Sequence, residues 1–264
     1  MGVTLPLWLR PPDLELRPAG VLEFLLATVL THAGFSFLHA RFEHRGHPRW
    51  TESRLSFAGV ACLALVGLLG WHLLRLVPDR IFVVYGLAVL FAGLLYVAPP
   101  VRFSRRPGGE IVLSMSLGLL PVLGGYLVQT GDLTRPVYLA ALPIYAAMLL
   151  RVWVEQMTVP GGEGNAAGDS LVTAFGRRVS GRVIVPLLSV LVCTTLIAAV
   201  LSAAVMPVAL IALIFVVPMA RIVTRSWCSF DDPSEMVRAR NGAIVVHAGL
   251  CAVLVASSIW AAAG

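Results

Sequence analysis

Eight long apolar stretches constrain this chain more than any other feature of its sequence. They lie at residues 21–38, 55–76, 81–98, 111–129, 137–154, 183–201, 205–222 and 243–263. Each approaches the roughly 20 apolar residues that an α-helix needs to cross about 30 Å of hydrocarbon. We therefore expect an all-α, polytopic transmembrane helical bundle of about eight spanning helices. Residues 21–264 would form a single transmembrane domain, and residues 1–20, which include four prolines, an N-terminal arm along the membrane surface.

The composition excludes an ordinary soluble domain. Hydrophobic residues make up 58% of the chain and charged residues 13%, and the mean hydropathy is +0.86. The isoelectric point near 9.7 comes from arginine alone, because the sequence contains no lysine. In a membrane protein this basic balance indicates cytoplasmic loops and anionic lipid rather than nucleic acid. The four cysteines form no CxxC pair, so neither a zinc site nor a disulfide framework is indicated.

The arginines are distributed unevenly between the two sides of the expected bundle. Fifteen of them lie in or beside the odd-numbered connections, and five lie in the even-numbered connections and the N-terminal arm. Because positively charged loops remain cytoplasmic, this asymmetry predicts that the odd connections face the cytoplasm and both termini lie outside.

The segment that ends the first apolar stretch combines imidazoles, guanidiniums and a carboxylate. His32, His39 and Glu43 fall on one helical face, since offsets of seven and eleven return to the same side. Ionisable groups at a membrane boundary are costly unless they face a protein interior or a cavity, so this face is a candidate functional site. A rival interpretation is a transition-metal site formed by His39, Glu43, His44 and His47, although their spacing matches no defined ligand signature.

The third connection carries a resemblance to a known family. Tyr96, Pro99 and Pro100 lead through Arg102 and Arg106 to a helix that starts with Gly109-Glu110, and Gly118, Pro121, Gly124, Tyr126, Gln129, Thr130 and Gly131 follow. This pattern resembles the UbiA-type intramembrane prenyltransferases, above all the 1,4-dihydroxy-2-naphthoate prenyltransferases of menaquinone synthesis. Pro143, Gly168, Leu171, Gly176-Arg177-Arg178 and the last helix with His247 extend the likeness over nearly the whole chain.

The resemblance implies both an activity and two departures from the family pattern. Members have nine spanning helices, and by this comparison we expect the chain to lack the first. Two Asp-rich motifs of the family hold Mg²⁺, which binds the diphosphate of an isoprenyl donor. The first motif falls on residues 39–43, where Ala40 and Glu43 replace aspartates, and the second falls on residues 159–163, where Glu163 is the acid that is left. A partner subunit or a second copy of the chain would be one source of the missing helix and acids.

The same resemblance assigns roles to basic residues. Arg102 and Arg106 stand at the positions of family residues that bind phosphate, while Ser104 replaces a usual lysine. Magnesium prefers hard oxygen ligands, and arginine suits bidentate phosphate contacts. We therefore expect Glu43 and Glu163 to act as catalytic metal ligands, and Arg102, Arg106 and His39 to bind the diphosphate. The partners would be an isoprenyl diphosphate, an aromatic acceptor and membrane lipid, and the location would be a bacterial inner membrane.

Other interpretations of these residues remain open from the sequence. Glu43 could be an interfacial acid paired with Arg41 or Arg45, Glu163 a solvated loop acid, and the arginines plain topology determinants. The chain would then be an inactive or repurposed relative that binds lipid or assists assembly. A transporter is a third class, suggested by residues 151–156 alone.

Four further polar features favour structural roles. Arg151 and Glu155 have the spacing of a local ion pair, and His72 and His247 are expected to be packed and hydrogen-bonded. The acidic pair Asp231-Asp232 before Pro233 is typical of a turn or a helix cap.

Overall fold

The computed structural model describes residues 18–42, 51–76, 80–158, 170–202 and 207–263, and every regular element within them is a helix. Eight of these helices are long and apolar enough to cross a membrane: Ala19–Phe42, Glu52–Leu76, Arg80–Val97, Gly109–Thr130, Arg135–Thr158, Arg177–Leu201, Ile211–Cys228 and Pro233–Ala256. The predicted all-α, polytopic fold is thereby confirmed. The first helix begins at Pro18, a favoured residue for the first turn, and residues 1–17 of the predicted arm lie outside the described residues.

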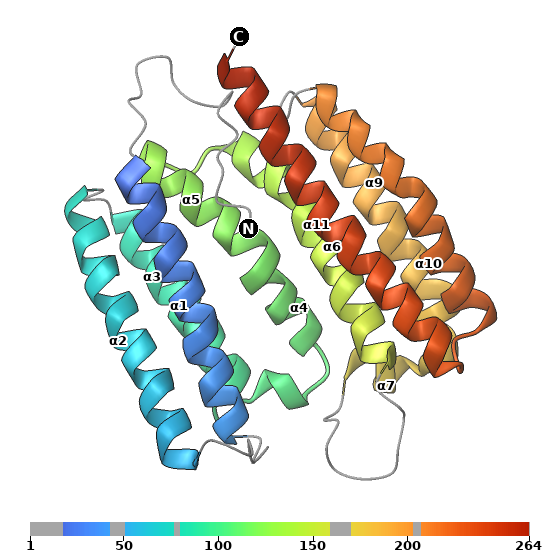
Figure 1. Ribbon diagram of the computed structural model, residues 1–264, viewed down its shortest axis with the longest axis horizontal. Helices are drawn as coiled ribbons and strands as arrows, with labels where there is room; N and C mark the ends of the chain where they lie inside the picture. The colour runs from blue at the N-terminus through green and yellow to red at the C-terminus, as the bar shows by residue number, and fades with distance from the viewer. Residues whose placement is uncertain (1–17, 43–50, 77–79, 159–169, 203–206, 264) are drawn as a thin grey trace.

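The helices form two groups that lie side by side (Figure 1). The N-terminal group consists of α1 (Pro18–Phe42), α2 (Glu52–Leu76), α3 (Arg80–Val97) and the span Gly109–Thr130. The C-terminal group consists of α6 (Arg135–Thr158), α9 (Val185–Leu201), α10 (Val216–Cys228) and α11 (Pro233–Ala263).

Several spans are composite. The span Gly109–Thr130 contains α4 (Gly109–Ser114), a π-helical turn (Met115–Leu119) and α5 (Leu120–Thr130). Short elements precede α9 and α10: α7 (Leu171–Phe175), α8 (Arg177–Val179), the π-helical turn Ser180–Ile184 and the 3₁₀ segment Pro207–Phe215.

Helix α6 forms the centre of the C-terminal group. In its apolar window 72% of the residues are buried, against 11% in the corresponding windows of α2 and α3. Small side chains at Ala140, Ala141, Ala146 and Ala147 are almost fully buried, which lets neighbouring helices approach the α6 backbone closely. The core of the molecule therefore lies around α6, where α9 and α11 pack against it, while α10 packs against α11 and α9.

The N-terminal group is close-packed only between α1 and α2. A Cβ atom added at Gly59 of α2 would lie 2.8 Å from Cγ of Leu38 on α1, so the two helices meet with little room between them. On α3, the ring of Phe35 occupies the space over Gly93. Between α2, α3 and the span Gly109–Thr130, a buried cluster that includes Leu73, Phe82 and Leu127 fills part of the space, and a cavity occupies another part.

One end of the bundle, the lower end in Figure 1, gathers the odd-numbered connections. A guanidinium N–H of Arg102 donates to the Phe42 carbonyl, the backbone N–H of Leu171 donates to Glu110, and Arg177 donates to the Phe230 carbonyl over 2.9 Å. These contacts join the ends of α1, α3, α4, α7 and α10 at what we call the arginine end.

Helix α11 starts earlier than the apolar pattern predicts, at Pro233 rather than at residue 243. Asp232 caps it, because Oδ1 accepts from the backbone N–H of Ser234 over 2.8 Å and from that of Glu235 over 3.4 Å. Glu235 then pairs with Arg238 at 2.5 Å and with Arg225 of α10 at 3.3 Å. The capping role expected of the Asp231-Asp232 pair is confirmed for Asp232.

Candidate functional site

A cavity of about 370 Å³ lies within the N-terminal group. Its lining comes from α1, α2, α3 and the span Gly109–Thr130, and it is largely apolar, with Phe35, Phe82 and Leu117 among the walls. Sites that bind small molecules in proteins are typically concave, mostly apolar and about 300–1,000 Å³ in volume. The cavity therefore has the size and character of a binding site for an apolar ligand.

Glycines create part of this space. A Cβ atom built at Gly67, Gly70 or Gly86 would meet no atom within 4 Å, and all three residues line the cavity. These positions differ from Gly59, where a side chain would collide with Leu38. The three glycines thus widen the cavity, whereas Gly59 allows helices to pack.

The cavity reaches the arginine end through Tyr96. This residue lines the cavity one position before the end of α3, and its ring centroid lies 6.1 Å from that of His39 on α1. His39 is in turn one helical turn from Phe42, whose carbonyl accepts from Arg102. The structure therefore brings two of the predicted diphosphate-binding residues, His39 and Arg102, to one end of the cavity.

The local backbone holds Arg102 in this position. Its φ of 48° is in the left-handed region, where a residue with a side chain costs about 1–2 kcal/mol, and the contact with Phe42 accompanies this conformation. Arg102 Nε is buried and has no hydrogen-bond partner among the described residues. Within the described part of the chain, this N–H of the guanidinium is therefore uncommitted.

The other predicted phosphate contact, Arg106, is exposed. It donates to the Pro100 carbonyl over 3.0 Å, which braces the connection between α3 and α4. Two glycines let this connection turn into α4: Gly108 has a φ of 98°, and a Cβ atom at Gly109 would lie 2.1 Å from the Phe103 carbonyl oxygen. Arg106 therefore lies close to Arg102 in sequence, but its guanidinium bonds to the backbone of its own connection.

The two predicted metal ligands, Glu43 and Glu163, lie outside the described residues. So do His44, His47 and Arg45, which the rival interpretations of the first connection invoke. Arg41, the other expected partner of Glu43, forms an ion pair of 2.9 Å with Glu52 at the start of α2.

One carboxylate at this end was not singled out by the sequence, namely Glu110. It is 4% exposed, its Oε1 accepts from the Leu171 N–H over 2.9 Å, and its Oε2 is buried without a hydrogen-bond partner among the described residues. Glu110 thereby ties the start of α4 to the start of α7.

The described residues contain no group of three or more histidines, cysteines, aspartates or glutamates able to hold a metal ion. They do supply one hard oxygen of the kind that Mg²⁺ prefers, Oε2 of Glu110. The fit of this end to Mg²⁺ therefore depends on Glu110 together with the two acids of the flanking connections.

Other polar groups act structurally. Arg151 forms no ion pair with Glu155 in the described part of the chain, so the local pair expected from their spacing is wrong; Arg151 Nε is buried without a partner there. His72 does bond, with Nδ1 lying 2.8 Å from Oε2 of Glu23 at the end opposite the arginine end. His247 lies against Cys251 on its own helix, with 3.9 Å between Nε2 and Sγ.

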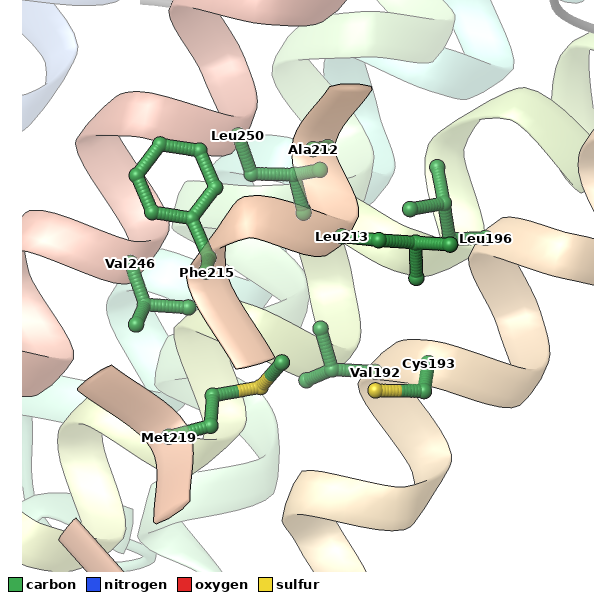
Figure 2. Close-up of a pocket in the computed structure, with 9 residues that line it drawn as sticks. All are labelled: Val192, Cys193, Leu196, Ala212, Leu213, Phe215, Met219, Val246 and Leu250. Atoms are coloured by element: carbon green, nitrogen blue, oxygen red, sulfur yellow. The ribbon is translucent and has the colours of Figure 1, made fainter. Parts of the chain in front are cut away.

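The C-terminal group contains a much smaller space. Figure 2 shows the apolar side chains and the Cys193 thiol that surround it, drawn from α9, α11 and the composite span that ends in α10. Its volume is about 10 Å³, at the lower limit of the space that one water molecule occupies. Its lining is apolar apart from sulfur atoms, so a water there would lack the two to four hydrogen-bond partners that it needs. This space is a packing gap, so it is no candidate site.

Comparison with known proteins finds no protein-family model that matches the sequence and no curated protein that matches it. The functional argument therefore rests on the cavity, its polar end and the sequence pattern of the third connection.

Proposed function

We propose that the protein is an intramembrane prenyltransferase, which transfers a polyprenyl group from its diphosphate to an aromatic acceptor such as 1,4-dihydroxy-2-naphthoate. The observation that carries this proposal is the apolar cavity of about 370 Å³ with His39 and Arg102 at one end. An amphipathic donor matches that arrangement, because its hydrocarbon chain suits the apolar walls and its diphosphate suits the basic end. The pattern of Tyr96, Pro99, Pro100, Arg102 and Gly109-Glu110 supports the same class.

In this proposal each residue has a defined task. Arg102 binds phosphate oxygens through its uncommitted N–H, and His39 donates a further hydrogen bond to the leaving diphosphate. The apolar walls exclude water, so the allylic cation that forms when the carbon–oxygen bond breaks survives long enough to meet the acceptor ring. Mg²⁺, held by Glu43 and Glu163, would supply the charge that stabilises the departing diphosphate.

The proposal extends to location and orientation. The arginine end would face the cytoplasm of a bacterial cell, and the bundle would lie in the inner membrane. The fifteen arginines of the odd connections support this orientation.

An alternative is a repurposed relative that binds a lipid and assists assembly without catalysis. The observation that favours it is that the described residues at the arginine end supply one buried carboxylate oxygen without a hydrogen-bond partner, Oε2 of Glu110, and no group of three or more acids, histidines or cysteines. Both candidates need the cavity, so turnover separates them.

A transfer assay tests the proposal. Protein in nanodiscs is incubated with a labelled isoprenyl diphosphate and 1,4-dihydroxy-2-naphthoate, with and without Mg²⁺. We expect prenylated product that requires Mg²⁺, at least a tenfold loss in Arg102→Gln, Glu43→Gln and Glu163→Gln, and a similar loss in Gly86→Leu, which fills the cavity. Arg80→Gln removes a charge at the opposite end, and Ala64→Leu enlarges an exposed α2 position outside the cavity lining; both should leave the rate unchanged. Binding of the diphosphate without any product would favour the repurposed relative.

A further inference from the structure

The cavity contains one polar side chain that the proposed diphosphate site does not use, His32. It lines the cavity within α1, eleven residues before Glu43 and well inside the apolar part of the helix. An ionisable group at that depth is costly unless it serves a cavity or a partner. The question is what the imidazole bonds to.

Four side-chain hydroxyl groups that line the same cavity donate to backbone carbonyls. Thr28 donates to the Phe24 carbonyl over 2.8 Å, Thr31 to that of Ala27 over 2.7 Å, Ser116 to that of Val112 over 2.8 Å and Tyr85 to that of Leu120 over 2.9 Å. Each of these bonds satisfies the donor within the protein. The structure records no such bond for His32 among the residues that it describes. His32 is exposed on α1 and lines the cavity, so its ring nitrogens are accessible to a ligand there.

The distance between His32 and His39 would allow two substrates to bind next to each other, one at each histidine. They are separated by seven residues on α1, which at 1.5 Å per residue is roughly 10 Å along the helix axis. A diphosphate at His39 and Arg102 would place its reacting carbon toward His32. An aromatic ring bound at His32 would then lie next to that carbon.

Aromatic side chains line this part of the cavity. Phe35 is one turn from His32 on the same wall, and its ring is fixed over Gly93 of α3, where an added Cβ atom would lie 2.1 Å from it. Aromatic rings prefer offset-stacked or edge-to-face neighbours at 4.5–7 Å between centroids, a contact that Phe35 can offer to a flat ligand. The imidazole then supplies the one directional bond.

We propose that His32 is the acceptor-binding residue, and that it recognises a ring hydroxyl of an aromatic ligand held against Phe35. The identity of the ligand as prenyl acceptor rests on the proposed function, but the binding itself does not require turnover. The hydrogen bond orients the ring so that its nucleophilic carbon faces the arginine end.

Equilibrium binding in nanodiscs tests this assignment with two matched probes, 1-naphthol and naphthalene. A hydrogen bond to a neutral partner contributes about 1 kcal/mol net, so His32→Ala should weaken 1-naphthol binding about fivefold to tenfold and leave naphthalene binding unchanged. His32→Gln keeps a polar group of similar reach and should recover part of the loss. His247→Gln, in the C-terminal group, removes an imidazole from another span and should change neither affinity.

Equal losses for both probes, or no loss for 1-naphthol, would overturn the role of His32. If product forms in the transfer assay, the same variant should raise the KM for the acceptor and leave the KM for the isoprenyl diphosphate unchanged. Turnover with an unaltered acceptor KM would refute the His32 assignment and leave the prenyltransferase proposal standing. Hydroxyl-selective binding that depends on His32, without turnover, would refute the enzyme proposal and leave the ring-binding site standing.

Discussion

The two groups of helices differ in how closely their helices pack. In the C-terminal group, small residues bring the helices onto α6, and the apolar space drawn in Figure 2 has a volume of about 10 Å³. In the N-terminal group, glycines at positions 67, 70 and 86 leave space beside them, and a cavity of about 370 Å³ remains. Small residues therefore close one half of the bundle and open the other.

This difference separates stability from function. A hydrocarbon solvent gives little hydrophobic drive for helices to associate, so van der Waals contact carries much of the stability. Most of that contact lies around α6, which leaves the N-terminal group free to keep an open cavity. Substitutions of the same kind in the two groups should therefore change the free energy of unfolding by different amounts.

The largest effect should come from removing a core side chain of α6. Leu150 is fully buried, so Leu150→Ala should lower the free energy of unfolding by about 4 kcal/mol, because the neighbours cannot fill the space. Val89→Ala, on the cavity wall, should cost less than about 1 kcal/mol, since its side chain already borders empty space. Unfolding in mixed detergent micelles measures both, and equal losses would contradict the contrast between the groups.

Replacing a glycine by alanine should destabilise the protein at Gly181 and stabilise it at Gly86. At Gly181 a new Cβ atom would lie 2.2 Å from the Ser226 carbonyl oxygen, so Gly181→Ala should cost about 3 kcal/mol through overpacking. At Gly86 the new atom meets nothing within 4 Å, and alanine is the better helix former, so Gly86→Ala should stabilise by about 0.5 kcal/mol. Thermal unfolding of the two variants in one detergent provides the measurement. A destabilised Gly86→Ala would show that the space beside α3 is filled in the membrane.

A smaller effect is expected where the two groups are joined. Glu110→Ala removes the acceptor of the partly buried Leu171 N–H, and the loss of this hydrogen bond should cost about 1 kcal/mol. Glu110→Gln keeps an acceptor oxygen and should lose less. Hydrogen exchange at Leu171 should accelerate in the alanine variant alone, and unchanged exchange there would rule out the contact.

The smallest effect should be a pH-dependent one at the start of α11. Hydrogen bonds from Ser234 hold the pKa of Asp232 below its usual value near 3.8. A lowered pKa in the folded state means that the carboxylate stabilises α11 above about pH 4 and that this contribution is lost as pH falls through the folded pKa. The difference in unfolding temperature between the wild type and Asp232→Ala should therefore be constant above pH 5 and shrink below pH 4. A difference that persists at pH 2.5 would contradict the charged cap.

Hydropathy alone predicted the eight spans, because crossing hydrocarbon leaves few alternatives to a long apolar helix. It missed the early start of α11 at Pro233, where a cap and ion pairs extend the helix through polar residues. It also missed the π-helical turn Met115–Leu119, since the apolar pattern continues through it.

The candidate site was only partly predictable. The resemblance pointed to His39 and Arg102, which the structure places at one end of the cavity, whereas the link between Glu110 and Leu171 joins residues far apart in sequence. The cavity was not foreseeable, because Gly59 and Gly86 look alike in sequence and differ only in what faces them across the bundle. The predicted metal ligands Glu43 and Glu163 remain predictions.

Photo-crosslinking tests whether an isoprenyl diphosphate occupies the cavity of the N-terminal group. A photoreactive isoprenyl diphosphate is bound to the protein in nanodiscs, irradiated, and located by mass spectrometry of the labelled peptides. Occupation of the cavity predicts labels on cavity-facing residues of α2 and α3, such as Val66 and Leu90, that disappear in Gly86→Leu and persist in Ala64→Leu. Labels confined to α9, α10 and α11, or unaffected by Gly86→Leu, would contradict the account.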